Sequence, residues 1–249
     1  LVLARPQTTN KWQNSEIEGI DIMLAIDVST SMLAEDLKPN RLEAAKDVAA
    51  EFINGRPNDN IGITLFAGET FTQCPLTVDH AVLLDMIHNI KCGLITDGTA
   101  VGMGIANAVT RLKDSKAKSK VIILLTDGTN NKGDISPMTA AEIAKSFGIR
   151  VYTIGVGTNG MAPYPYPVGN TVQYVSMPVE IDEKTLTEIA GTTDGNYFRA
   201  TSNSKLKEVY EEIDKLEKTK LNVKEYSKRD EEYHWFALAA FLCVLLEVL

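Results

Sequence analysis

The 249-residue chain is poor in cysteine and histidine and has no excess of basic residues. Its formal net charge is −8, with 25 Lys and Arg against 33 Asp and Glu. Nucleic-acid-binding proteins usually carry a basic face, so this balance argues against a nucleic-acid partner. The cysteines Cys74, Cys92 and Cys243 form neither a closely spaced metal cluster nor a disulfide framework. We expect Cys74 and Cys92 to be separate thiols, although an oxidising compartment would allow them to pair.

Several catalytic signatures are also missing. There is no G-x-x-x-x-G-K-[ST], which excludes a P-loop nucleotidase, and no G-x-S-x-G of a serine hydrolase. The stretch GVGTNG has the spacing of a dinucleotide loop, but MAPYPYP follows it and cannot begin the helix that such a loop needs. The stretch DGTNNKGD lacks the closing glutamate of a calcium loop. His80, His88 and His234 have no evident nucleophile to serve, which favours structural or solvated roles.

The longest apolar run is WFALAAFLCVLLEVL at residues 235–249. It is apolar on every helical face, which favours a membrane segment over a C-terminal core helix. Because a spanning helix needs about 20 residues, we interpret 234–249 as the start of a transmembrane helix. We expect 1–17 to be a membrane-proximal segment and 218–233 to be a linker. Basic residues flank both ends, so charge alone does not fix the side of the membrane.

Strand and helix patterns alternate between these ends, over residues 18–217. Short apolar runs predict buried strands at 19–27, 60–68, 119–128, 149–157 and 195–200, with a short edge strand at 70–74. Apolar residues at helical spacing predict helices at 40–56, 79–90, 100–113, 138–148, 183–193 and 202–218. Such alternation is typical of a doubly wound α/β fold, a mostly parallel sheet with helices on both faces. The Pro-rich stretch 164–182 has no helical pattern.

Acidic and hydroxyl side chains gather where two of these strands end. Asp27, Ser29 and Ser31 form D-x-S-x-S directly after the first strand, and Asp127 follows the strand at 119–128. The carboxyl ends of parallel strands share one edge of the sheet, and Thr99 lies in a Gly-rich loop expected to cross it. Hard oxygen ligands of this kind suit Mg²⁺ or Mn²⁺. The alternative is that the serines cap a helix and the aspartate begins a turn.

Further residues around this edge are candidates for supporting roles. Those next to the proposed ligands could orient a metal-bound water or shape the loops, namely Asp97, Gly98 and Gly128. Those on the exposed edge and the Pro-rich stretch could contact a partner, namely Glu35, Asp36, Glu69, Tyr164 and Tyr166. The two tyrosines could equally belong to a stiff surface loop.

The D-x-S-x-S after a buried strand, the Thr in a Gly-rich loop and the T-D-G after a second strand resemble the metal-ion-dependent adhesion site of von Willebrand factor A (VWA) domains. The resemblance covers about residues 18–217, and all five positions match. It implies that Ser29, Ser31 and Thr99 contact the metal directly, while Asp27 and Asp127 act mostly through water. It also implies that a partner's carboxylate fills the remaining position.

A narrower resemblance is carried by ARPQ, SMLAEDLKPNRLEAAK, CPLTVDHAVLLDMI, GLITDGTAVGMGIANA, the stretch from EIDEKTLTEIAG to KLEKTK and the apolar tail. These segments are similar to the Bat proteins of bacterial aerotolerance operons. That family implies a VWA domain held between membrane helices, on the periplasmic side of the inner membrane. It further implies other Bat proteins and a MoxR-type AAA+ ATPase as partners.

The sequence therefore predicts a membrane-anchored, metal-dependent protein-binding module rather than an enzyme. One rival is a Mg²⁺-dependent phosphatase with Asp27 as nucleophile. Haloacid-dehalogenase-like phosphatases use D-x-D, however, and Ser29 stands where their general acid would be and cannot donate a proton near neutral pH. A second rival is a structural module whose metal site is silent.

Overall fold

The computed structural model describes residues 7–8, 19–158, 160–168, 171–222 and 230–231. By its internal contacts the chain divides into one unit of residues 17–221 and another of residues 1–16 with 222–249. In the second unit, β1 (Gln7–Thr8) pairs antiparallel with β10 (Asp230–Glu231). The described helices include none long and apolar enough to cross a membrane. The transmembrane segment predicted at 234–249 lies outside the described residues.

The larger unit is built on a six-stranded sheet in the order β4-β3-β2-β5-β6-β9. Its strands are β2 (Asp21–Asp27), β3 (Asn60–Phe66), β4 (Thr70–Thr77), β5 (Lys120–Thr126), β6 (Arg150–Val156) and β9 (Tyr197–Ala200). All neighbours are parallel except β4, the antiparallel edge strand, which runs three residues beyond the stretch predicted for it. The chain goes from β2 to β3 on one side and later returns to β5 on the other. The ends of β2 and β5 thus flank the point where the strand order reverses, where open α/β sheets place their ligands.

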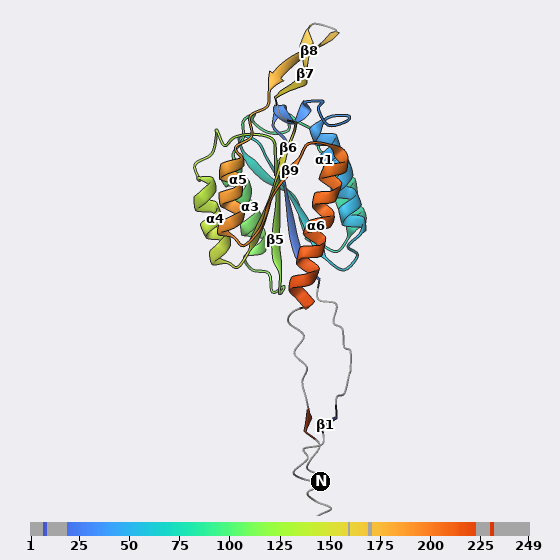
Figure 1. Ribbon diagram of the computed structural model, residues 1–249, viewed down its shortest axis with the longest axis vertical. Coiled ribbons are helices and arrows are strands. Elements are labelled where there is room, and N and C mark those ends of the chain that lie inside the picture. Colours follow the sequence, from blue (N-terminus) through green and yellow to red (C-terminus); the bar gives the residue numbers. More distant parts are fainter. Residues whose placement is uncertain (1–6, 9–18, 159, 169–170, 223–229, 232–249) are drawn as a thin grey trace, which may run out of the picture. The chain divides into compact units, whose positions relative to one another are not determined.

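Helices cover both faces of this sheet (Figure 1). One face packs against α1 (Arg41–Asn54), α2 (His80–His88) and α6 (Asn203–Asn222). The other packs against α3 (Val101–Leu112), α4 (Pro137–Ser146) and α5 (Glu183–Thr192). Strand β2 has apolar side chains on both faces of the sheet, so both faces must pack against helices. Leu24 lies in the core with α1, α2 and α6, whereas Met23 and Ala25 lie in the core with α3, α4 and α5. The predicted α/β architecture is confirmed for these residues.

Helix ends follow the capping residues in the sequence. Asn40 accepts a hydrogen bond from the backbone N–H of Glu43 at 2.8 Å and begins α1. Asp79 accepts one from Val82 and begins α2, while Gly55 ends α1. Such caps satisfy N–H groups that a helix start leaves without intrahelical partners.

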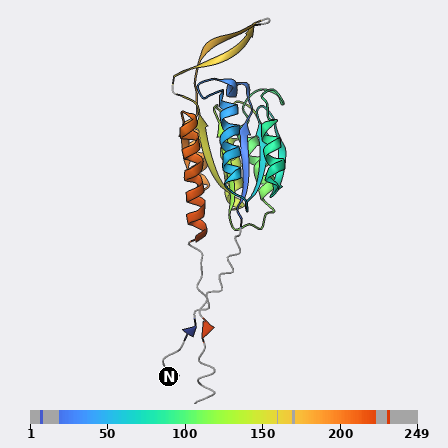
Figure 2. The ribbon, with the colours of Figure 1, turned by 90° about the vertical axis from the view of Figure 1, so that its right-hand side faces the viewer.

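The Pro-rich stretch, for which the sequence predicted no helix, forms a β-hairpin. Strand β7 (Met161–Val168) pairs antiparallel with β8 (Thr171–Pro178), and neither strand joins the main sheet. In both ribbon views the hairpin extends beyond the end of the sheet at which α1 begins (Figures 1 and 2). Proline is tolerated here because an isolated hairpin consists only of edge strands.

Candidate metal site

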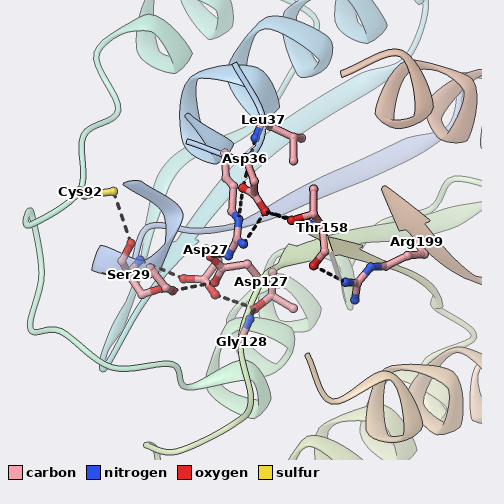
Figure 3. Close-up of polar contacts among 12 residues, drawn as sticks. Asp27, Ser29, Asp36, Leu37, Cys92, Asp127, Gly128, Thr158 and Arg199 are labelled. Atoms are coloured by element: carbon pink, nitrogen blue, oxygen red, sulfur yellow. Dashed lines mark hydrogen bonds and ion pairs between the residues drawn. The ribbon is translucent and has the colours of Figure 1, made fainter. Parts of the chain in front are cut away.

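Asp27 is the last residue of β2, and its side chain is fixed on both sides. The residue is fully buried. One carboxylate oxygen accepts the backbone N–H of Ser29 at 2.9 Å, and the other accepts the hydroxyl of Thr126 at 2.6 Å (Figure 3). The first bond turns the chain sharply after the strand, just before the short 3-10 helix η2 (Thr30–Leu33). The second ties the end of β2 to the end of β5, so the carboxylate is held in one orientation.

The two serines connect Asp27's loop to Asp127. The hydroxyl oxygens of Ser29 and Ser31 lie 2.9 Å apart, and the hydroxyl of Ser31 donates to Asp127 at 2.7 Å. Ser29 and Asp127 are buried, and Ser31 is half-buried. The structure thus brings four of the residues predicted as ligands into one hydrogen-bonded group at the end of β2 and β5.

Thr99 reaches the same place from the loop that precedes α3. Its N–H donates to the side chain of Asn131 at 2.9 Å, and its carbonyl accepts the N–H of Asn131 at 2.9 Å. A methyl group placed on Gly128 would lie 3.2 Å from the Thr99 hydroxyl, so this hydroxyl borders the turn directly after Asp127. Gly98, with φ of +124°, adopts a backbone conformation that favours glycine and so allows the loop to cross here.

The site concentrates negative charge away from water. Burial, and next the nearby charge of Asp127, raise the pKa of Asp27 to about 7. Burial also raises the pKa of Asp127, although Arg41 opposes this by donating to its carboxylate at 2.7 Å. Within the part of the chain that the structure describes, no ion pair reaches Asp27. Arg41 is shared between Asp127 and Asp36, so these buried carboxyl groups together leave negative charge at Asp27 that a cation would compensate.

Arg41 and Asp36 form a buried pair that sequence reasoning missed. Nε and Nη2 of Arg41 each donate to Asp36 at 2.7 Å, and Asp36 also accepts the N–H of Thr158 at 2.7 Å (Figure 3). Burial alone would raise the pKa of Asp36, but the bonds from Arg41 and Thr158 outweigh it and lower this pKa to about 2. Asp36 was predicted as part of a partner surface, but its side chain is only 3% exposed and pairs with Arg41. An arginine at the start of a helix gives no signal of this role.

The other residues predicted to support the site occupy the loops around it. Asp97 is exposed and accepts the N–H and the hydroxyl of Thr30, so it anchors the residue between the two serines. The side chain of Glu35 accepts the hydroxyl of Tyr174 at 3.0 Å, and that of Glu69 accepts the hydroxyl of Thr96 at 3.1 Å.

The two tyrosines predicted as a partner surface both lie on β7. Tyr166 is 58% exposed and Tyr164 is half-buried.

The two cysteines in the described part of the chain are separate. Cys74 is buried in β4, and Cys92 donates its thiol to the carbonyl of Ser29 at 3.4 Å. Burial, with the nearby carboxylates, raises the pKa of Cys92 to about 12, so the group stays a neutral thiol at physiological pH. The sulfur therefore packs under the serine loop and is no anionic metal ligand.

The donors present at the site fit a hard divalent cation. They are carboxylate and hydroxyl oxygens, which Mg²⁺ and Mn²⁺ prefer. Over the described residues, no group of three or more His, Cys, Asp and Glu side chains could hold a metal ion. A cation at this edge of the sheet would therefore depend on the serine and threonine hydroxyls as well as the carboxylates.

Comparison with known proteins identifies the family of this domain. The family model of the von Willebrand factor type A domain matches residues 21–212. The chain belongs to that family. The domain is also similar to a solved structure described as the conserved hypothetical protein BatB from Bacteroides thetaiotaomicron. The two share 34% sequence identity over 80% of this chain and 100% of that one, with a TM-score of 0.70. An aerotolerance-related membrane protein from Bacteroides fragilis gives 34% identity over 79% of this chain and 100% of that one, with a TM-score of 0.68.

Within the VWA family the chain thus belongs to the Bat group, whose VWA-domain proteins are typically non-enzymatic adhesion or structural modules. An uncharacterised protein of Borreliella burgdorferi is 29% identical over 98% of this chain and 72% of its own length. A UPF0353 protein of Mycolicibacterium paratuberculosis is 32% identical over 76% of this chain, which spans 58% of that relative. Proximal thread matrix protein 1 of the mussel byssus, solved with zinc in its MIDAS motif, is 25% identical over 80% of this chain and 45% of that one, with a TM-score of 0.62.

Proposed function

We propose that this VWA domain holds Mg²⁺ or Mn²⁺ through Asp27, Ser29, Ser31, Thr99 and Asp127 and uses the ion to bind a carboxylate of a protein partner. The observation that carries this is the buried Asp27 beside Asp127, without an ion pair of its own in the described part of the chain. A divalent cation supplies positive charge for both carboxylates and an open position for a partner's Asp or Glu. Zinc in the MIDAS motif of the mussel relative supports a metal at such a site.

The surrounding residues keep the proposed ligands in place before any ion or partner arrives. Thr126 and the N–H of Ser29 fix Asp27, and Arg41 fixes Asp127 from the side opposite Ser31. Ligands held by such outer hydrogen bonds lose little conformational freedom on binding, which supports affinity. Recognition is then shared between the ion and the exposed residues around it.

A phosphatase reaction at Asp27 is disfavoured by the same geometry. A carboxylate nucleophile must itself reach the substrate, but both oxygens of Asp27 accept hydrogen bonds and the residue is fully buried. A carboxylate that acts on the metal through water needs no such direct contact. Ser29 follows where an Asp-based phosphatase would carry its general acid. These contacts support a binding role in preference to turnover.

We further propose that the domain is anchored in the bacterial inner membrane by a helix beginning at 234–249 and faces the periplasm. The relative from Bacteroides fragilis is described as a membrane protein, which supports anchoring. Other Bat proteins and a MoxR-type AAA+ ATPase are the partners that membership of the group suggests.

Alkaline carbonate washing of membranes tests the proposed anchor. It should leave the chain in the pellet and release a chain that ends at residue 222. Release of both would contradict the anchor.

Partner capture from native membranes tests the proposed function. The tagged chain is incubated with solubilised membranes in Mg²⁺ or in EDTA, and retained proteins are identified by mass spectrometry. We expect a partner that is retained only in Mg²⁺ and is lost with Asp27→Asn. Asp79→Asn is the matched control, because it makes the same chemical change at the exposed cap of α2, which asparagine also caps.

The test compares the proteins retained by the wild type in Mg²⁺ with those retained in EDTA and by Asp27→Asn. A partner retained equally in EDTA, or retained by Asp27→Asn, would show that the metal site is not the recognition surface. Circular dichroism of Asp27→Asn confirms that the variant is folded, and Ser29→Ala gives a second variant that keeps both carboxylates.

A further inference from the structure

The β7–β8 hairpin has a composition unlike the rest of the chain. Residues 161–178 contain no Asp, Glu, Lys or Arg, although the whole chain carries a net charge of −8. Its exposed large apolar side chains, each between 47% and 59% exposed, are Met161, Tyr166, Val172, Tyr174, Val175 and Met177. The hairpin also extends away from the helices and the main sheet (Figures 1 and 2). It therefore presents an uncharged, partly apolar surface in an accessible position.

The outer edge of β7 is closed to further strands. Pro163, Pro165 and Pro167 occupy alternate positions of this strand and have no N–H to donate. The N–H of Glu35 donates to the carbonyl of Pro163 at 2.9 Å, so the backbone at this position faces away from β8 and towards the loop after η2. Alternate prolines on an outward edge are a known protection against strand addition.

The outer edge of β8 has no such protection from Val172 to Ser176, and its one outward proline, Pro178, is at the end of the strand. In an antiparallel pair, residues directly opposite each other both point their backbone groups inward or both point them outward. Val172, Tyr174 and Ser176 lie opposite the three prolines, so their N–H and C=O groups also point outward. Within the described part of the chain, these backbone groups have no hydrogen-bond partner. Three consecutive outward positions therefore offer both a donor and an acceptor.

We propose that the outer edge of β8 pairs antiparallel with the same edge of a second copy of this chain. A two-fold axis at Tyr174 places Tyr174 opposite itself and Val172 opposite Ser176 of the other copy. Each such pair exchanges an N–H and a C=O in both directions, so every outward backbone group of Val172, Tyr174 and Ser176 finds a partner. The two hairpins then form one four-stranded sheet, β7-β8-β8-β7, whose two outer edges are both closed by proline.

Two features of the hairpin favour a second copy as the occupant. First, the edge is self-complementary, since the same three residues provide matching donors and acceptors after a two-fold rotation, as a symmetric dimer requires. Second, two chains of net charge −8 repel each other, and this uncharged segment lets them meet without bringing like charges together. A two-stranded hairpin is marginally stable alone, so forming a four-stranded sheet also stabilises each copy.

Sedimentation of the full-length chain in mild detergent over a range of concentrations tests this pairing. We expect a monomer–dimer equilibrium that Ser176→Pro weakens by about tenfold or more, because two outward N–H donors are lost per dimer. Ser176→Ala is the matched control, since it removes the hydroxyl but keeps the N–H, and it should leave the dimer intact. The proline leaves the β7–β8 bonds unchanged because Ser176 lies opposite Pro163, at an outward position. A chain that is monomeric at every concentration, or a dimer unaffected by Ser176→Pro, would overturn the proposal.

Cysteine cross-linking tests the register separately. Opposed residues of an antiparallel pair lie about 5.5 Å apart between Cα atoms, within the range of a disulfide. Val172→Cys and Ser176→Cys chains should therefore cross-link in a mixture and not when each is oxidised alone, with the unsubstituted chain as background. Equal cross-linking of the single variants would contradict this register. Asp27→Asn should dimerise like the wild type, so failure of the metal site and failure of the dimer are distinguishable.

Discussion

Replacing Arg41 by glutamine removes the cation that pairs with two buried carboxylates. Its guanidinium donates to Asp36 twice and to Asp127 once, each at 2.7 Å, and the three side chains are at most 4% exposed. Without Arg41, both carboxylates remain buried without their opposite charge. Breaking a buried ion pair from one side costs about 3–5 kcal/mol. We expect the free energy of unfolding at pH 7 to fall by about that amount, a large part of the stability of an ordinary domain.

Urea denaturation followed by circular dichroism, in EDTA, measures this loss. Asp36→Asn should cost less, about 1–3 kcal/mol, because it removes one of the charges and leaves Arg41 paired with Asp127. Lys207→Gln breaks the ion pair with Glu51, in which both side chains are at least half exposed, and should have little effect. Unfolding of Arg41→Gln at the urea concentration of the wild type, or a greater loss of stability for Asp36→Asn, would show that Arg41 does not stabilise these carboxylates.

Two further predictions concern stability. The pKa of Asp36 is lowered from its ordinary 3.8 to about 2, so its contribution is present above about pH 4 and is lost as pH falls towards 2. Between pH 5 and pH 2 the wild type should lose about 2 kcal/mol more than Asp36→Asn in urea titrations, and parallel losses would contradict this. Gly102→Ala in α3 places a methyl group 2.1 Å from the backbone oxygen of Ile135 and should lower the thermal midpoint. Gly191→Ala in α5 meets nothing within 4 Å and should raise the midpoint slightly, and the reverse order would refute the packing argument.

The proximity of Asp27 and Asp127 could be predicted from sequence because it follows from general rules. Alternating strand and helix patterns imply a parallel sheet, and residues at the ends of its strands share one edge. Asn40 and Asp79 similarly marked the starts of α1 and α2, since their side chains cap helices wherever they precede an apolar helical pattern. Local chemistry determined these features, so local patterns were enough to find them.

The contacts of Arg41 could not be predicted in this way. Arg41 and Asp127 are 86 positions apart, and only the order of strands in the folded sheet brings them together. Asp36 was predicted as a partner-surface residue because nothing near it in the sequence identifies Arg41 as its ion-pair partner.

The hairpin was missed for a different reason. Prolines normally argue against a strand, and only the pairing of β7 with β8 shows that they all lie on the outward edge.

Calorimetric titration of the purified chain with Mg²⁺ and with Mn²⁺ tests most directly whether the proposed ligand residues hold a cation. We expect binding at one site per chain, abolished by Asp27→Asn, weakened by Ser29→Ala and unchanged by Asp79→Asn. A bound ion should also stabilise the fold, by about 2.7 kcal/mol at a free concentration one hundred times Kd. Absence of binding by the wild type, or equal binding by Asp27→Asn, would contradict the proposal that these oxygen ligands hold a cation.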